Sequence, residues 1–204
     1  MSTAPPYVSQ WGDLDCNHAV IERGEDPAAL HDWRRDGYAS AEDYRLWSRN
    51  TCGLACLASV LGALGQDVPR VSELVAGAVA SGALVPQVDG RVDGLYYHPF
   101  VRWVREAFPV EAEVRPELAV DEVVDLVRDQ GRYVMASVST ELRWPERPPT
   151  RRGGHLVLVY DAEGDDLVFH NPSGLGPTAA GARCSSRTFS RSFAGRGIVM
   201  GGRR

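Results

Sequence analysis

The segment from Cys52 to Leu64 constrains the fold of this chain more than any other part of the sequence. Its apolar side chains recur at three- and four-residue spacing, which places them on one face of a helix: Leu54, Leu57, Ala58, Leu61 and Leu64. Asn50 or Thr51 is the expected cap of this helix, and Gly65 follows where glycine commonly ends one. The sequence therefore predicts a helix that begins at a cysteine.

The order of the other elements indicates the fold class. Helices are expected over residues 71–80, 98–108 and 118–128, and strands over residues 110–114, 133–138, 155–161, 167–170 and 197–200. A mostly helical first half and a mostly β-like second half favour an α+β domain, in which a helical layer packs on an antiparallel sheet. The 204 residues are 44% hydrophobic and contain no repeat or linker, so we expect a single domain over residues 1–204.

Bulk composition argues against several classes of function. A net charge of −5 offers no basic surface for nucleic acid. No apolar run approaches the roughly 18 residues that cross a bilayer, and residues 1–6 lack the features of a signal peptide. We therefore expect a cytoplasmic protein, without membrane or nucleic-acid partners, whose thiols remain reduced.

The four cysteines do not follow a metal-binding pattern. Cys52 and Cys56 lie four residues apart on one helix face, without the spacing or the second close pair of a zinc or redox site. A zinc site that recruits Cys16, His18 or Cys184 is the disfavoured alternative, and Cys56 is more simply a small buried side chain. We expect neither a metal nor a cofactor.

Cysteine chemistry needs a thiolate, a base and a group that orients the base. A helix start favours the thiolate of Cys52, because unpaired backbone N–H groups and the positive end of the helix dipole lie there. Residues 162–164 are interpreted as the turn of a hairpin that places His155 directly opposite Asn171. A one-residue slip would bring His170 there instead. The pattern favours a Cys52–His155–Asn171 constellation.

Four further residues are candidates for contact with a substrate. Gln10, on a short extended segment, offers an amide donor for the oxyanion of an acyl transfer, beside the backbone N–H of Cys52. Trp144, in the loop before the histidine strand, is a candidate wall of a cleft. Arg151 and Arg152 are weaker candidates for binding a substrate carboxylate. The alternative is a surface position for Gln10 and a solvated loop for the two arginines.

Three motifs together resemble a known family. Cys52-Gly53-Leu54-Ala55-Cys56-Leu57-Ala58 resembles the nucleophile helix of the cysteine peptidases that cut double-glycine leader peptides from bacteriocin precursors. Gly153-Gly154-His155-Leu156-Val157-Leu158-Val159 is similar to their histidine strand, and Asn171-Pro172 stands where they usually have Asp-Pro. The stand-alone bacterial branch of that family has a segment like Tyr7-Val8-Ser9-Gln10-Trp11 near its N-terminus. The resemblance spans residues 7–198.

The resemblance implies a papain-like fold, with Cys52 as the nucleophile, His155 as the general base and acid, Asn171 as the orienting residue and Gln10 in the oxyanion hole. Leader peptidases carry their glutamine just before the cysteine, whereas Gln10 lies 42 residues upstream. Residues 13–49 are therefore expected to form a helical insertion that could roof the cleft. Asparagine in place of the usual aspartate is chemically acceptable, since papain itself uses asparagine.

The expected function is that of a cysteine hydrolase, which cleaves a peptide or amide bond through a thioester acyl-enzyme. An amine can accept the acyl group in place of water, so an acyltransferase or amide-forming enzyme of small-peptide biosynthesis is one alternative. A non-catalytic module that binds a peptide is another. The expected partner in each case is a peptide or an amide.

Overall fold

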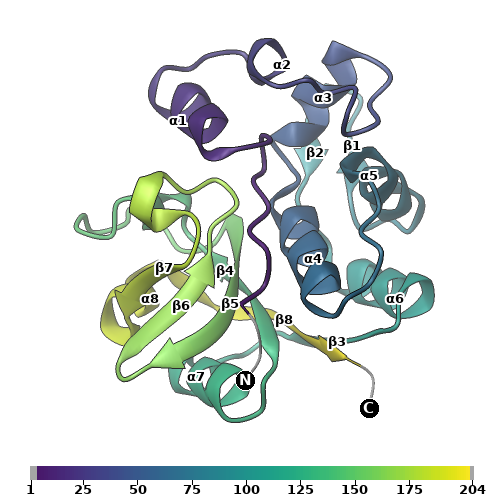
Figure 1. Ribbon diagram of the computed structural model, residues 1–204. Coiled ribbons are helices and arrows are strands. Elements are labelled where there is room, and N and C mark those ends of the chain that lie inside the picture. Colours follow the sequence, from purple (N-terminus) through teal and green to yellow (C-terminus); the bar gives the residue numbers. More distant parts are fainter. Residues whose placement is uncertain (1–3, 203–204) are drawn as a thin grey trace.

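The computed structural model describes residues 4–202 (Figure 1). Its helices are α1 (Leu14–Glu22), α2 (Pro27–Leu30), α3 (Ala41–Ser48), α4 (Cys52–Ala63), α5 (Val71–Ala80), α6 (Tyr97–Ala107), α7 (Val120–Arg128) and α8 (Ser186–Ser192), with short 3-10 turns η1 (Thr140–Arg143) and η2 (Gly176–Thr178). Its strands are β1 (Val85–Pro86), β2 (Val92–Asp93), β3 (Val110–Arg115), β4 (Tyr133–Val138), β5 (His155–Glu163), β6 (Asp166–His170), β7 (Ala182–Ser185) and β8 (Phe193–Gly202).

Six of these strands form one sheet in the order β3-β8-β4-β5-β6-β7, in which every neighbouring pair is antiparallel. Strands β1 and β2 form a separate two-stranded sheet. Helices cover both faces of the larger sheet, so the fold is α+β, as the order of the elements predicts. No helix within residues 4–202 combines the length and the apolar character that crossing a membrane demands.

Alternation along the strands sends side chains into two separate cores. Leu156 and Leu158 of β5 join the core under helices α4, α5 and α6. Val157 and Val159 of the same strand join the core under α7 and α8. Strand β5 is therefore buried on both faces, which holds its first residue, His155, at a fixed place in the sheet.

Helix α4 lies in the larger of these cores, and all residues from Gly53 to Leu61 are buried. The glycine at its second position permits this packing, because a Cβ there would lie 2.8 Å from Leu95 Cδ2 and 3.0 Å from Leu156 Cδ1. The sequence predicts the helix correctly, and the close packing fixes its N-terminal turn against β5.

The hairpin of β5 and β6 forms, but the predicted register is wrong. The turn lies at Gly164 and Asp165, with Glu163 paired to Asp166, and a bulge between Val159 and Asp161 shifts the pairing by one residue. Beyond the bulge Leu158 pairs with His170, a register that would bring Ser173 rather than Asn171 opposite His155. Asn171 still meets His155, but by a different path. Strand β6 ends at His170, and the chain then turns so that Asn171 Oδ1 lies beside the imidazole.

Residues 4–12 run between helix α4 and the sheet, as the purple trace in Figure 1 shows. The carbonyl of Pro5 accepts a hydrogen bond of 2.8 Å from His170 Nε2, and the ring of Pro6 packs on Gly62 of α4. Helices α1, α2 and α3 follow within the segment 13–49.

Candidate active site

Cys52 and His155 line one cavity of about 640 Å³. The same cavity is lined by Arg49, Asn50, Asp93, Gly94, Leu95, Tyr96, Tyr97, Ser137, Gly154, Leu156 and Arg196. Its walls come from the start of α4, the segment between β2 and α6, and strands β4, β5 and β8. Of the expected roof, residues 13–49, only Arg49 is among the described residues that line this space. A volume of this size lies within the usual range of ligand-binding pockets.

Cys52 is the first residue of α4, and its half-buried thiol lies beside the first residues of β5. The backbone N–H groups of Leu156, Gly53 and Cys52 itself interact with the thiol in the sense that lowers its pKa. Four residues later, Cys56 is 1% exposed and its thiol donates to the Leu156 carbonyl, at 3.8 Å. The first cysteine therefore opens into the cleft, whereas the second is a packed core residue.

His155 begins β5 and pairs with Val138 of β4. Its Nε2 lies 2.8 Å from Oδ1 of Asn171, and both residues are buried. The backbone N–H of Ser173 donates to the same oxygen, at 3.2 Å. Because the oxygen accepts from the Ser173 N–H, it is the acceptor for His155 also. The proton of the neutral imidazole then resides on Nε2, and Nδ1 is free to accept one.

Asn171, Pro172, Ser173 and Gly174 form a tight turn, here named the Asn171–Gly174 loop, closed by a 2.9 Å bond from the Gly174 N–H to the Asn171 carbonyl. Arg143 of η1 donates from Nε to the Ser173 carbonyl at 2.6 Å and from Nη2 to the Ser173 hydroxyl at 2.5 Å. The same hydroxyl oxygen lies 3.2 Å from His155 Nε2. Sequence reasoning named neither Arg143 nor Ser173, since no motif marks them.

The opposite flank of this loop is held by the N-terminal part of the chain. Gln10 donates its backbone N–H to the Pro172 carbonyl at 2.8 Å. The fully buried Asn17 donates from Nδ2 to the Gly174 carbonyl at 2.9 Å and to the Pro172 carbonyl at 3.3 Å. The side chain of Gln10 is also buried, and its Nε2 donates to the carbonyl of Ser48, at 2.7 Å. Gln10 thus joins this loop to the last residue of α3, four positions before Cys52.

The other candidates lie outside this cavity. Trp144 is half-buried, with the guanidinium of Arg147 5.8 Å from its ring centre. Arg151 and Arg152 are exposed and line a different cavity, of about 370 Å³. His170, the alternative partner for His155, uses Nε2 on Pro5 and accepts at Nδ1 from the N–H of Gly181. The structure thus brings Cys52, His155 and Asn171 together and leaves these four residues apart from them.

The electrostatics of the cleft differ from the expectation for a helix start. Burial raises the pKa of the Cys52 thiol, and the surrounding N–H groups and the charge of Arg143 oppose that rise without cancelling it. Burial, together with the charge of Arg143, lowers the pKa of His155 to about 4, against the opposing effect of the Asn171 hydrogen bond. Both shifts favour the uncharged forms, a thiol at Cys52 and a neutral imidazole at His155.

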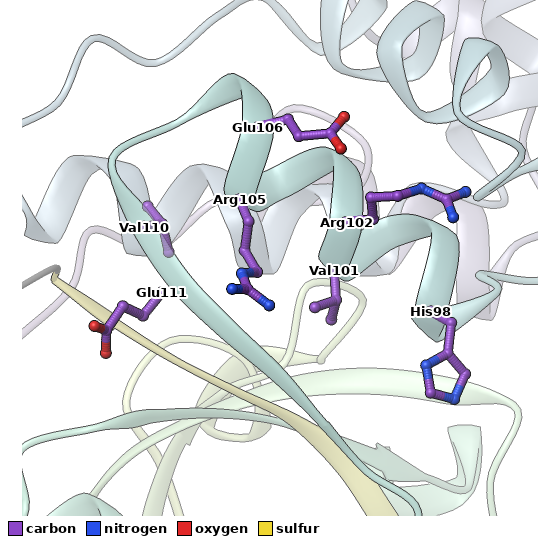
Figure 2. Close-up of a pocket in the computed structure, with 7 residues that line it drawn as sticks. All are labelled: His98, Val101, Arg102, Arg105, Glu106, Val110 and Glu111. Carbon is purple, nitrogen blue, oxygen red and sulfur yellow. The ribbon is translucent and has the colours of Figure 1, made fainter.

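A second cavity of about 640 Å³ lies between α6 and β3. Figure 2 shows Arg105 and Val101 directed from the helix toward the open space beside the strand, and Glu106 directed away from it. None of the described residues that line it belongs to the predicted site. Across residues 4–202, no cluster of three or more His, Cys, Asp or Glu side chains is arranged to hold a metal ion.

The sequence matches no protein-family profile and no curated protein. Among solved structures, a Bacillus anthracis protein described as a C39-like peptidase has a TM-score of 0.55 and 13% identity, over 76% of this chain and 90% of that one. The peptidase domain of Streptococcus ComA, a bifunctional ABC transporter in a quorum-sensing pathway, has a TM-score of 0.49 and 16% identity, over 76% and 93% of the two chains. A double-glycine motif protease from an AMS/PCAT transporter, solved with a leader peptide, has a TM-score of 0.47 and 17% identity, over 74% and 84%. By its similarity to the first of these, the chain has the papain-like α+β fold of a C39-like peptidase.

Proposed function

We propose that this protein is a cysteine peptidase, with Cys52 as the nucleophile, His155 as the general base and acid, and Asn171 as the residue that orients the histidine. The observation that carries the proposal is the 2.8 Å bond between His155 Nε2 and Asn171 Oδ1, beside a cavity that Cys52 lines. That bond leaves Nδ1 of the imidazole as the nitrogen that can take the thiol proton. Fold similarity alone does not carry a function.

The reaction starts from the uncharged thiol and the neutral imidazole. His155 accepts the proton of the Cys52 thiol at Nδ1 as the sulfur attacks the carbonyl carbon of the substrate. The imidazolium then gives this proton to the departing amine, which leaves a thioester on Cys52. Water, deprotonated by the same nitrogen, attacks the thioester and releases the acid, and the proton returns to the sulfur. Asn171 keeps the Nε2 proton in place throughout.

The developing oxyanion needs hydrogen-bond donors. The N–H of Cys52, at the start of α4, is one candidate. The amide of Gln10 is the second: one of its two N–H bonds is donated to the Ser48 carbonyl, and the other is the one that would serve the oxyanion. Gln10 is not among the described residues that line the cavity, so its contribution depends on a bound substrate reaching toward Ser48.

The proposed substrate is a peptide or amide, because these are carbonyl compounds that a cysteine nucleophile with a histidine base can cleave, and Cys52 and His155 line one cavity. All four cysteines are free thiols, which suits the reducing conditions of the cytoplasm. Within the part of the chain that the structure describes, no specific contact favours an amine over water as the acceptor of the acyl group. We therefore propose hydrolysis as the reaction.

Mass spectrometry of peptide cleavage tests this function. A peptide library that includes double-glycine sequences is incubated with the wild type, Cys52→Ala and Cys56→Ala. We expect cleavage by the wild type and by Cys56→Ala, and none by Cys52→Ala. Equal loss in both variants, with folding intact, would contradict a single nucleophile. Peptide binding without cleavage by the wild type, unchanged in Cys52→Ala, would identify a binding module instead.

Alkylation by iodoacetamide provides a second, substrate-free readout. We expect Cys52 to react faster than the other three cysteines, and this advantage to disappear in His155→Ala, because the imidazole is the group that removes the thiol proton. Peptide mapping separates Cys52 from Cys56, which serves as the buried internal control. Unselective labelling that is equal in both proteins would refute the assigned pair.

A further inference from the structure

Arg143 is a cation at the edge of the candidate site, and within residues 4–202 it forms no ion pair with a carboxylate. Its side chain donates two hydrogen bonds, both to Ser173. Its own carbonyl accepts a bond of 3.2 Å from Thr178, which fixes the backbone of η1 beside the Asn171–Gly174 loop. Burial lowers the pKa of Arg143 to about 10, so the guanidinium still carries its charge at neutral pH.

The two bonds from Arg143 determine what Ser173 can do. A guanidinium only donates hydrogen bonds, so both the carbonyl and the hydroxyl oxygen of Ser173 accept from it. Ser173 is completely buried, and its hydroxyl oxygen is 3.2 Å from His155 Nε2. The Nε2 proton is therefore shared between two acceptors, Oδ1 of Asn171 and the Ser173 hydroxyl.

We propose that Arg143 is a positioning residue for the Cys52–His155 pair: it holds Ser173 against His155 Nε2 and places a fixed positive charge beside the nucleophile and the base. This inference rests on the function proposed above and adds a residue to it. Arg143 forms and breaks no bond in the reaction. It acts through Ser173 on the ring, and through space on the charges that develop.

The charge of Arg143 has opposite consequences for the two reacting groups. A nearby cation stabilises the thiolate and destabilises the imidazolium, and Arg143 lowers the pKa of both Cys52 and His155. The thiolate is then easier to form, and the imidazolium is a stronger acid toward the departing amine. An ion pair with a carboxylate would weaken this effect, because the negative charge would compensate that of Arg143 at the two reacting groups.

Other charged groups surround the same space. The cavity is lined by two exposed arginines, Arg49 before α4 and Arg196 of β8, and by Asp93 of β2. Neither arginine bonds to the loop that holds His155. Asp93 is engaged by Gln87 and Tyr96. Arg143 is distinguished from these by its hydrogen-bonded path to the imidazole.

The test is the pH profile of Cys52 alkylation by iodoacetamide in the wild type, Arg143→Met and Arg143→Lys, with Arg187→Met, an exposed arginine of α8, as the matched control. For Arg143→Met we expect a profile displaced by about one pH unit to higher pH, so that labelling at pH 7 slows about tenfold. Arg143→Lys retains the charge and should recover most of the displacement. Arg187→Met should match the wild type.

The variant Ser173→Ala separates the effect of the hydrogen bond between Ser173 and His155 from the effect of the Arg143 charge. This variant keeps Arg143 but removes the hydroxyl acceptor, so ¹⁵N NMR of His155 should show a larger fraction of the tautomer protonated at Nδ1, while the alkylation profile moves less than in Arg143→Met. Thermal unfolding of each variant verifies that it is folded. If Arg143→Met does not fold, the alkylation profile of Arg143→Lys is compared with that of the wild type instead.

Two results would overturn the inference. One is an unchanged alkylation profile in Arg143→Met together with a lower melting temperature, which would reduce Arg143 to a structural role. The other is a His155 tautomer unaffected by Ser173→Ala. Failure of the proposed function looks different: wild-type labelling of Cys52 would then already be independent of His155, whatever residue stands at position 143.

Discussion

The two sides of the candidate site are held in place by different forces. On the nucleophile side, Cys52 is the first residue of a helix whose next nine residues, Gly53 to Leu61, are all buried in an apolar core. On the base side, His155 and Asn171 are held by a network of hydrogen bonds around the Asn171–Gly174 loop. Packing fixes one reacting group, and polar contacts fix the other.

This difference determines how each side tolerates change. Apolar packing is non-directional, so neighbouring side chains can shift by tenths of an ångström and retain most of their contact energy. A buried hydrogen-bond network loses a whole interaction when one partner moves, and leaves the remaining groups without partners. The base side should therefore be the more fragile of the two.

A methyl group added to each side compares them directly and gives the largest expected effect. A Cβ at Gly174 would lie 2.2 Å from the backbone oxygen of Thr178 and 2.5 Å from Cα of Ala179, whereas a Cβ at Gly53 meets only side-chain ends. We expect Gly174→Ala to lower the free energy of unfolding by at least about 3 kcal/mol, and Gly53→Ala by about 1–2 kcal/mol. Urea denaturation measures both, and equal losses would remove the distinction between the two sides.

The protonation of His155 provides the next largest effect. Its pKa of about 4 in the folded state lies below the usual 6.5, so the unfolded chain binds the proton more readily. Stability is then fully present above about pH 6.5 and is lost as the pH falls toward 4, by up to about 3 kcal/mol from a shift of about 2.5 units. His170, whose pKa burial also lowers, adds to this loss, and His31, whose pKa Asp36 raises, opposes it.

Unfolding free energies at pH 7 and pH 4.5 check this expectation in the wild type and in His155→Gln. The glutamine has no titration, so the variant should lose less stability on acidification than the wild type. The acidification losses of His170 and His31 are common to both proteins and cancel in the comparison. Equal losses would mean that His155 titrates normally in the folded protein.

Asn17 tests the outer flank of the same loop, with a smaller effect. Replacement by leucine keeps the volume but removes the donors to the Pro172 and Gly174 carbonyls. We expect a loss of about 2 kcal/mol, because the Pro172 carbonyl keeps its bond from Gln10 and the Gly174 carbonyl loses its donor. Cleavage activity should also fall, because a displaced Asn171–Gly174 loop would no longer hold Asn171 against His155. Unchanged urea denaturation would show that the N-terminal flank does not brace the loop.

The nucleophile side was the more predictable from the sequence. The apolar repeat predicts helix α4, and the predicted start at Cys52 and end near Gly65 agree with the structure. The same local signals predict α5 over residues 71–80 and β4 over residues 133–138 with correct bounds. Periodicity and capping are properties of neighbours in the sequence, which is why they can be read without the fold.

The base side was predicted only in part. The proximity of His155 and Asn171 is as expected, but the path to it is not, because the bulge after Val159 shifts the register and a turn at the end of β6 restores the contact. The bonds from Arg143 to Ser173 cross 30 positions and carry no periodic signal. Contacts between side chains and distant backbone groups depend on the final fold. The role of residues 13–49 as an insertion stays a prediction.

The contacts of the N-terminal segment with late parts of the chain determine when the candidate site can assemble during synthesis. Pro5 and Gln10 find their partners at His170 and Pro172, and 165 positions separate Pro5 from His170. Cys52 is synthesised 103 residues before His155, which at typical elongation rates is roughly 5–20 s. A growing chain thus carries its thiol well before the base and its bracing loop exist. Translation itself delays the proposed activity until the whole site has been made.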